Sequence, residues 1–360
     1  MQVVPRLIDE VVKRWPWTPA SKVTLLAIEY DTGDEEQNKK FLEDIRSRVQ
    51  LVYRCNIPQP LKADDNGKEL YTDKGWGCAL RVMQMMLAQG FVSFRLGREW
   101  RFDAEKDLKP GSEYMDIVSC FLDEPSAPFS LHRFVGEGWR LLRKAPSVWF
   151  GPTSGARVAA DLFRQAQEPD TAVQAPHFLK RLACVTFEDG VVYKEKVQLH
   201  FDAGASGVLF FVCRRLGVEK FNFAEYQKGV QGCFSLPQFQ GLASGNNSTS
   251  AHFFVATSDD RLVFLDPHIT LPALSTLEQI PGMPESGLQA RGPLYLRWGS
   301  LNPSVCMGFL VHSSEEFLEL CATLSQGDMG QVFEVLERAP VYVARTEETY
   351  DEDDDIVVLQ

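Results

Sequence analysis

Hydrophobic and polar positions divide this chain into a helix-rich first part and a strand-rich second part. Residues 79–89 contain no Gly or Pro and consist mostly of good helix formers, with apolar side chains on nearly every face. This pattern predicts a buried central helix. Before it, the charged run from about Asp34 to Val52 predicts a helix, and the polar residues 59–75 predict a loop. Further along, residues 115–122 and the Ala-rich residues 156–166 predict two more helices.

The second part of the chain changes character. The continuous apolar run 208–213 predicts a buried strand. Residues 251–257 and 262–266 are apolar runs around a polar turn, which predicts a hairpin. Between these segments, residues 241–250 are rich in Gly, Ser and Asn and predict a flexible loop. Residues 341–343 could form a last strand. Helices followed by a sheet indicate an α+β fold.

Composition narrows the class of protein. With 360 residues, 24 Phe and 7 Trp, the chain can bury one large core or two ordinary ones. No stretch approaches the ~20 apolar residues that span a bilayer, and the N-terminus lacks the apolar core of a secretory signal. Eight cysteines without a CxxC pair indicate free thiols and no structural zinc site. We therefore expect a cytoplasmic protein with no metal and no cofactor.

The negative charge is concentrated at the C-terminus. The formal net charge is −12, and residues 346–360 contain seven acidic and no basic residues. We expect this segment to be a disordered acidic tail following a folded region over residues 1–345, of which residues 1–35 could be mobile. The charge argues against nucleic acid as a ligand and favours a partner with a basic face.

Cys78 is the strongest candidate for chemistry. It follows Gly75, Trp76 and Gly77 and stands at the start of the predicted central helix, where free amide groups and the helix dipole favour a thiolate. Glycines before it allow close approach of a ligand chain. The competing interpretation is that Cys78 is a small buried hydrophobic residue.

A nucleophilic thiol needs a base and a group that orients the base. Asp266 and His268 are two residues apart, so a strand would place them on the same face. His252, which begins the preceding strand, is the competing base, again with Asp266 as the orienting carboxylate. The geometric argument favours His268 but leaves both assignments open. The other four histidines lie in no such constellation.

Taken together, these motifs resemble the autophagin family of cysteine proteases over about residues 40–325. The matching runs, in chain order, are Tyr53-Arg54, Gly75-Trp76-Gly77-Cys78-Ala79-Leu80-Arg81 with Gln84-Met85 and Ala88-Gln89, Trp149-Phe150-Gly151-Pro152, Ser250-Ala251-His252-Phe253-Phe254, Leu265-Asp266-Pro267-His268, Leu301-Asn302-Pro303-Ser304 and Gly308-Phe309.

The resemblance implies a papain-like α+β fold with a small inserted finger-like subdomain. It also implies cleavage of the ubiquitin-like autophagy modifier after its C-terminal glycine, both in the precursor and in the form linked to phosphatidylethanolamine on autophagic membranes. Cys78 would be the nucleophile, His268 the base, Asp266 its orienting group and Tyr53 an oxyanion donor. Trp149 and the loop before Ser250 would clamp the substrate. The other substrate-binding residues would be Gly75, Trp76, Gly77, Ser250 and His252.

Three departures from the family pattern affect gating and substrate fit: Thr249 in place of Asn, Ile269-Thr270-Leu271 after the Asp-Pro-His run, and Ala243-Ser244-Gly245 in the regulatory loop. In the tail, Ile356 and Leu359 follow acidic residues and resemble a short strand-forming motif that docks the modifier. A tail that only solvates the protein is the alternative. For the whole chain, the alternatives are a protease for another modifier of the UFM type and an inactive binding scaffold.

Overall fold

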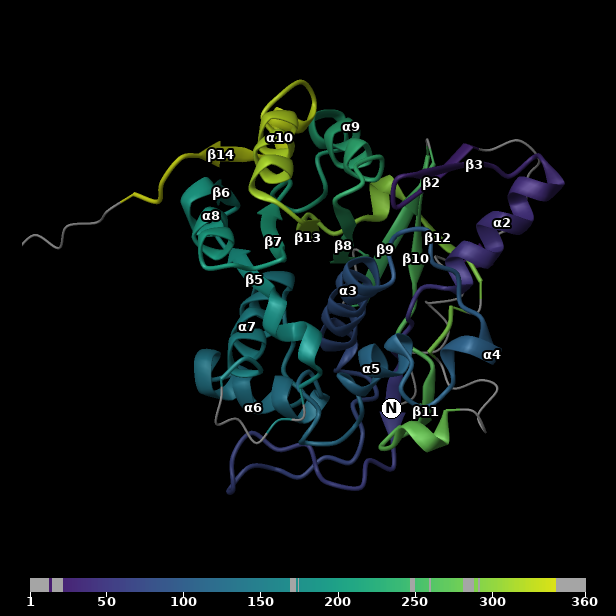
Figure 1. Cartoon of the computed structure of the whole chain (residues 1–360), viewed down its shortest axis with the longest axis vertical. Helices are drawn as coiled ribbons and strands as arrows, with labels where there is room; N and C mark the ends of the chain where they lie inside the picture. Colours follow the sequence, from purple (N-terminus) through teal and green to yellow (C-terminus); the bar gives the residue numbers. More distant parts are fainter. Residues whose placement is uncertain are drawn as a thin grey trace, which may run out of the picture.

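The computed structural model describes residues 13–14, 22–168, 173, 175–246, 250–258, 260–280, 288–290 and 292–340. Helix α3 (Cys78–Arg95) lies at its centre (Figure 1), and the side chains from Cys78 to Val92 are all buried. The predicted buried helix is therefore confirmed, and it extends six residues past Gln89. It packs on strands β8 (Phe239–Gly245) and β9 (Ala251–Thr257) and on helix α7 (Pro152–Gln165).

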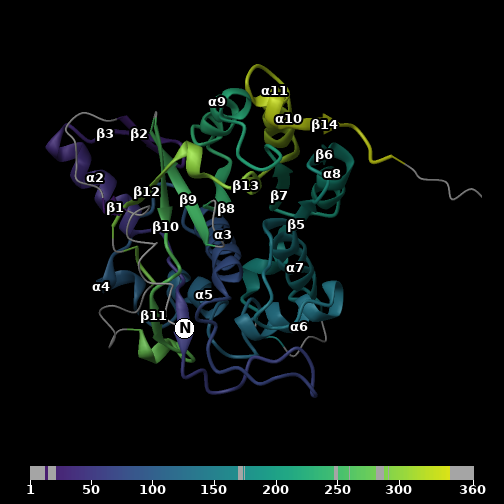
Figure 2. The ribbon, with the colours of Figure 1, turned by 180° about the vertical axis from the view of Figure 1, so that it is seen from behind.

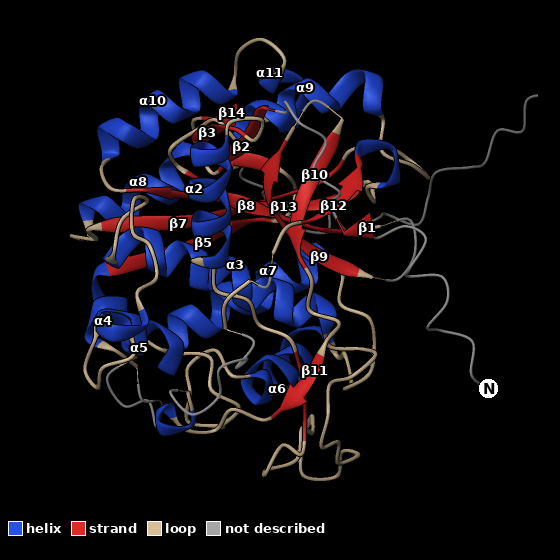
Figure 3. Cartoon of the chain, turned by 90° about the vertical axis from the view of Figure 1, so that its right-hand side faces the viewer, coloured by secondary structure: helices blue, strands red, loops and turns tan. Residues whose placement is uncertain are grey.

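Ten strands form the main sheet. Its order is β1-β12-β10-β9-β8-β13-β7-β5, and the β2–β3 hairpin joins it through β9. Strands β5 (Leu182–Phe187) and β7 (Gly207–Arg215) are parallel, and the other neighbouring pairs are antiparallel. Figure 3 shows the sheet between α9, α10 and α11 on one side and α3, α6 and α7 on the other. Both faces are thus covered, which explains why β7 to β9 are apolar almost throughout.

The predicted flexible loop at residues 241–250 is wrong over its first half. These residues form most of β8, which is fully buried between β9 and β13. The small residues serve close packing here, since a Cβ on Gly241 would lie 2.6 Å from the Phe253 ring and one on Gly245 would lie 2.4 Å from the Ser250 carbonyl oxygen. Gly241 also has φ +118°, which other residues rarely adopt. Residues 247–249 lie outside the described residues.

Other predicted elements are confirmed with shifted ends. Strands β9 and β10 (Arg261–Leu265) form the expected hairpin. Helix α2 (Glu35–Arg46) begins after Asp34, whose side chain caps the N–H of Gln37, and it ends six residues before the expected Val52. The expected helices at 115–122 and 156–166 are α5 (Glu113–Ser119) and α7. In residues 59–75 the structure has a single isolated bridge, between Leu61 and Leu70.

The remaining helices are α4 (Ala104–Asp107), α6 (Leu131–Leu142), α8 (Lys194–Asp202), α9 (Phe223–Cys233), α10 (Ser314–Leu324) and α11 (Met329–Val332), with 3₁₀ helices η1 (His177–Arg181), η2 (Leu277–Gln279) and η3 (Trp298–Ser300). The remaining strands are β1 (Lys13–Arg14), β2 (Lys22–Leu25), β3 (Ile28–Asp31), β4 (Tyr53–Cys55), β6 (Val191–Tyr193), β11 (Thr270–Pro272), β12 (Leu294–Arg297), β13 (Ser304–Val311) and β14 (Glu334–Leu336).

Two small parallel sheets accompany the main one: β4 pairs with β11, and β6 pairs with β14. Seen from behind, β6, β14 and α8 lie beyond the β5 edge of the main sheet (Figure 2). The buried apolar side chains form one continuous cluster, so the finger-like subdomain stays a prediction. Among the described residues, no helix combines the length and apolar character needed to cross a bilayer. The expected strand at 341–343 and the tail lie outside the described residues, as do residues 1–12 and 15–21 of the N-terminal segment.

Candidate active site

Cys78 is the first residue of α3, one position later than the N-cap, which is Gly77. The turn before it is closed by the Asp73 carbonyl oxygen, which accepts the N–H groups of Trp76 at 3.2 Å and Gly77 at 2.9 Å. Burial by itself raises the pKa of the thiol. The hydrogen bond and charge of His268, the N–H of Ala251 and the Tyr53 hydroxyl outweigh this effect and lower the pKa below its usual value. The site thus stabilises a thiolate.

His268 and Asp266 lie just beyond the end of β10. The Nδ1–H of His268 donates to Oδ1 of Asp266, and the backbone N–H of His268 donates to the same oxygen at 3.2 Å. Burial lowers the pKa of His268, but hydrogen bonds and charge from Asp266 and Cys78 raise it overall to about 9. Burial likewise opposes ionisation of Asp266, and its two histidine neighbours hold its pKa well below the usual range. At neutral pH the arrangement therefore favours imidazolium beside thiolate.

The structure distinguishes the two candidate histidines. His268 hydrogen-bonds to the Cys78 thiol and lowers its pKa, whereas His252 is not among the groups found to shift the pKa of the thiol. His252 is only 2% exposed and packs against the Phe264 ring, with ring centroids 4.3 Å apart. Its Nδ1 lies 3.7 Å from Oδ1 of Asp266, and neither ring nitrogen has a hydrogen-bond partner among the described residues. Burial lowers its pKa, so His252 is a neutral neighbour of the Asp266 carboxylate.

Tyr53 completes the group around the thiol. It begins β4, which pairs in parallel with β11, so the chain after His268 runs beside Tyr53. The Tyr53 ring meets His268 edge-on, with centroids 5.5 Å apart, and its hydroxyl hydrogen-bonds to the Cys78 thiol. Burial, followed by the Cys78 charge, raises the Tyr53 pKa, so the hydroxyl stays protonated and can donate a hydrogen bond. Thr270 and Leu271, where the sequence departs from the family pattern, lie on β11.

Sequence reasoning missed one residue beside the site. The side-chain Nε2 of Gln50 donates to the backbone carbonyl oxygen of Asp266 at 2.7 Å. This bond holds the main chain at Asp266, just after the end of β10. Nothing in the sequence around Gln50 identifies it, because the two residues are 216 positions apart and meet only in the fold.

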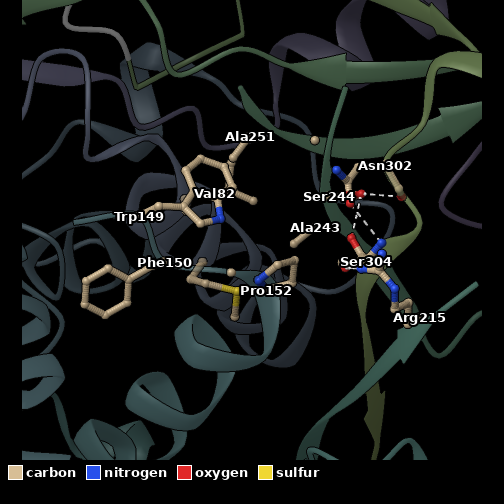
Figure 4. A pocket seen from close by; sticks show the side chains of 14 residues that line it. Val82, Trp149, Phe150, Pro152, Arg215, Ala243, Ser244, Ala251, Asn302 and Ser304 are labelled. Atoms are coloured by element: carbon tan, nitrogen blue, oxygen red, sulfur yellow. Dashed lines mark hydrogen bonds between the residues drawn. The ribbon is translucent and has the colours of Figure 1, made fainter. Parts of the chain in front are cut away.

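A cavity of about 190 Å³ is lined by neighbours of Cys78 and not by Cys78 itself, and Figure 4 shows its walls. Ala79, which follows Cys78, and Ala251, whose N–H faces the thiol, both contribute to its lining. One wall is apolar and the other is polar. The apolar wall includes Val82, Trp149, Phe150 and Pro152, and the polar wall includes Arg215, Ser244, Asn302 and Ser304.

Of the predicted substrate-binding residues, Trp149 lines this cavity and is 42% exposed, so core packing does not explain its position. Gly75, Trp76, Gly77, Ser250 and His252 are not part of the lining. Gly75 and Gly77 instead shape the turn before Cys78: Gly75 has φ +84°, and a Cβ on Gly77 would lie 2.6 Å from Cβ of Asp73. The Trp76 indole donates to the Thr72 carbonyl oxygen at 3.1 Å.

Among the described residues, His252, Asp266 and His268 are a group whose possible metal-ligand atoms all lie within 4.8 Å of one another. However, His268 and Asp266 already satisfy each other by hydrogen bonding, and His268 also contacts the thiol. The geometry therefore suits proton transfer at Cys78.

A comparison with protein families matches residues 38–323 to the Peptidase C54 catalytic domain. The chain belongs to this family. Its papain-like α+β fold places the N-terminus of a buried helix against a largely antiparallel sheet.

Curated relatives agree with this assignment. "Probable cysteine protease ATG4" of Pichia angusta is 29% identical, over 86% of this chain and 65% of its own length. "Cysteine protease 1" of Neurospora crassa is 32% identical, over 81% of this chain and 59% of its own length. "Cysteine protease ATG4B" of Xenopus laevis is 29% identical, over 90% and 86%. The chain thus spans less than two thirds of the first two relatives.

Proposed function

We propose that this protein is a cysteine peptidase that cleaves the ubiquitin-like autophagy modifier after its C-terminal glycine. The observation that carries the proposal is the hydrogen-bonded series from Cys78 through His268 to Asp266, placed at the N-terminus of α3. A thiol, a base and an orienting carboxylate in contact are the elements of nucleophilic acyl transfer. The names of the relatives, all cysteine proteases, support the same chemistry.

In this mechanism the Cys78 thiolate attacks the carbonyl carbon of the substrate glycine. The Cys78 N–H and the Tyr53 hydroxyl are the donors for the oxygen that becomes negative. The His268 imidazolium gives its proton to the leaving nitrogen as the C–N bond breaks, which leaves a thioester on Cys78. A water molecule then loses one proton to neutral His268 and attacks the thioester, which restores the thiolate and releases the carboxylic acid, whose remaining proton passes to solvent. Asp266 keeps the ring oriented and stabilises the imidazolium at each stage.

The cavity near Cys78 supports the proposal that the substrate binds through a narrow, extended C-terminal segment. Its volume of about 190 Å³ admits only a narrow segment of chain and excludes a folded domain. The exposed Trp149 and the neighbouring Pro152 offer apolar contact for an aromatic side chain, while the opposite wall carries hydroxyl and amide groups for a peptide backbone. A flexible tail ending in an aromatic residue and glycine fits these walls, and the glycine allows the close approach that the buried thiol requires.

Release of the modifier from phosphatidylethanolamine is part of the proposal, because the lipid is joined through the same type of amide bond. The protein would then meet autophagic membranes transiently, through its lipidated substrate, and would work in the cytoplasm. Ile356 and Leu359 of the tail would help by docking the modifier. Deletion of residues 350–360 is expected to weaken capture of membrane-bound modifier and leave cleavage of soluble precursor unchanged. Equal affinity and equal lipid release by both forms would refute the docking role.

The proposal is tested with C-terminally extended precursors of the autophagy modifier and the UFM-type modifier, assayed side by side. We expect the wild-type protein to cleave only the first, at the glycine, and Cys78→Ala to cleave neither. Cleavage of the second alone would assign the protein to a different modifier. Cleavage of neither precursor, by a protein that still binds the modifier, would indicate a scaffold.

A further inference from the structure

Four charged side chains form a buried cluster behind the candidate active site, which we call the buried quartet: Asp73, Asp123, Arg54 and Arg81. Each residue is at most 1% exposed. Arg81 bridges the two carboxylates, with Nε 2.8 Å from Asp73 Oδ2 and Nη2 3.0 Å from Asp123 Oδ1. Arg54 Nε lies 3.6 Å from Asp123 Oδ2. Two positive and two negative charges therefore compensate each other away from solvent.

One end of the buried quartet holds the turn that presents the nucleophile. Arg81 lies one helical turn into α3, and its partner Asp73 accepts the N–H groups of Trp76 and Gly77 with its backbone oxygen. Asp73 Oδ1 also accepts the backbone N–H of Arg54 at 2.6 Å. Since Arg54 follows Tyr53 on β4, this carboxylate connects the turn before Cys78 directly to the strand that carries Tyr53.

The other end holds the segment that follows His268. The backbone of Asp123 donates to the Leu274 carbonyl oxygen at 2.8 Å, and Asp123 Oδ2 accepts the Leu274 N–H at 2.8 Å. Arg54 Nη1 donates to the Pro272 carbonyl oxygen at 3.1 Å. Pro272 is the last residue of β11, and Leu274 follows two positions later. Strand β11 itself begins two positions after His268. Cys78, Tyr53 and His268 thus lie on or beside three segments of the chain, and the buried quartet contacts the main chain of all three.

We propose that the buried quartet positions Cys78, Tyr53 and His268 relative to one another, and that its four members are positioning residues of the reaction proposed above. A purely stabilising role explains the arrangement less well, because the cost of removing four charges from water often cancels their attraction. A buried charge cluster instead holds the segments that carry it in one relative arrangement, since any other arrangement would separate a buried charged group from its partner. Every main-chain contact that we have described for the quartet involves a segment carrying or adjoining a group at the thiol.

Two substitutions test the proposal. Arg81→Lys keeps the positive charge, but a lysine cannot bridge both carboxylates. Asp123→Asn keeps the shape of the side chain, but its NH₂ group would face a hydrogen-bond donor, either the Arg81 guanidinium or the Leu274 N–H. For each we expect kcat on the modifier precursor to fall on the order of 10²-fold with KM changing by less than about threefold, the result of a misplacement by about 1 Å. Alkylation of Cys78 by iodoacetamide at pH 6, followed by mass spectrometry of the Cys78 peptide, should slow by about tenfold, because the thiolate loses its imidazolium partner.

The matched control is Asp44→Asn. Asp44 is also fully buried and pairs with Arg48 at 3.0 Å and Arg98 at 2.8 Å, but its cluster lies between α2 and the β2–β3 hairpin. We expect Asp44→Asn to lower thermal stability while kcat and Cys78 alkylation stay within twofold of wild type, about the reproducibility of such rates.

Normal alkylation and normal kcat in folded Arg81→Lys and Asp123→Asn would overturn the proposal. So would an equal loss in Asp44→Asn, or failure of both quartet variants to fold while Asp44→Asn folds, because the quartet would then serve stability alone. Alkylation does not depend on the substrate. Slowed alkylation in a protein whose wild type cleaves no precursor would therefore support the positioning role and refute the proposed function, so the two failures are distinguishable.

Discussion

Asp266→Asn removes one negative charge from the site while keeping an acceptor oxygen for His268 Nδ1–H. Burial lowers the pKa of His268, and Asp266 and Cys78 together raise it from 6.5 to about 9. The Asp266 charge is one of several causes that overcome the burial effect, so its loss should lower the pKa on the order of one unit, or about 1.4 kcal/mol. The imidazolium beside the thiolate then deprotonates at a lower pH than in the wild type, while the ring keeps its orientation.

The assay is the pH dependence of kcat/KM on the modifier precursor, in which the alkaline limb reports loss of the imidazolium. We expect Asp266→Asn to move this limb lower by about one pH unit and to reduce kcat/KM about five- to tenfold at pH 9, with a smaller loss at pH 7. Asp266→Ala also loses the orienting acceptor and should fall further at every pH. An alkaline limb that stays in place or moves higher in Asp266→Asn would refute the ion-pair account.

Four other substitutions address separate features of the structure. In Gly77→Ala the new Cβ would lie 2.6 Å from Cβ of Asp73, so activity should fall on the order of 10²-fold. In Gly75→Ala the new Cβ would meet no atom within 4 Å, so activity should be retained. Its φ of +84° should cost about 1–2 kcal/mol of stability, measured by urea unfolding. Equal activities of Gly77→Ala and Gly75→Ala would contradict this reasoning. Trp149→Ala should raise KM at least tenfold and leave kcat and Tm nearly unchanged, as expected for an exposed pocket wall; a lowered Tm with normal KM would indicate packing instead. Burial opposes ionisation of Asp44, but its arginine neighbours lower its pKa, so its stabilisation is present above pH 3.8 and is lost as the pH falls below that value. The acid-induced decline in unfolding free energy should therefore be shallower in Asp44→Asn, and parallel curves would show that another group is responsible.

The sequence predicted the elements that carry a strong local pattern. Helix α3 has apolar residues all round and no breaker, and the β9–β10 hairpin has two apolar runs around a polar turn. Motif spacing and the family resemblance made Cys78, Asp266 and His268 candidates for the site, and the structure brings these three residues into contact. Local patterns alone left His252 as an alternative, because the two histidines flank the same hairpin and only tertiary packing places one of them beside the thiol.

What the sequence did not predict depends on contacts between distant segments. Composition suggested flexibility for residues 241–245, but in a buried strand small residues are required wherever a neighbouring ring or backbone approaches closely, as at Gly241. The buried quartet joins residues more than 150 positions apart, such as Asp123 and Leu274. Charged residues are usually exposed, so their sequence context gave no sign of burial.

The central claim is that Cys78 is the nucleophile for a glycine-terminated modifier. The most direct measurement is labelling with an autophagy modifier that carries an electrophile at its C-terminal glycine, followed by mass mapping of the adduct among the eight cysteines. The account predicts one adduct, on Cys78, that forms fastest below pH 9 and is absent in Cys78→Ala. No adduct on a folded wild-type protein, or an adduct on another cysteine, would contradict it.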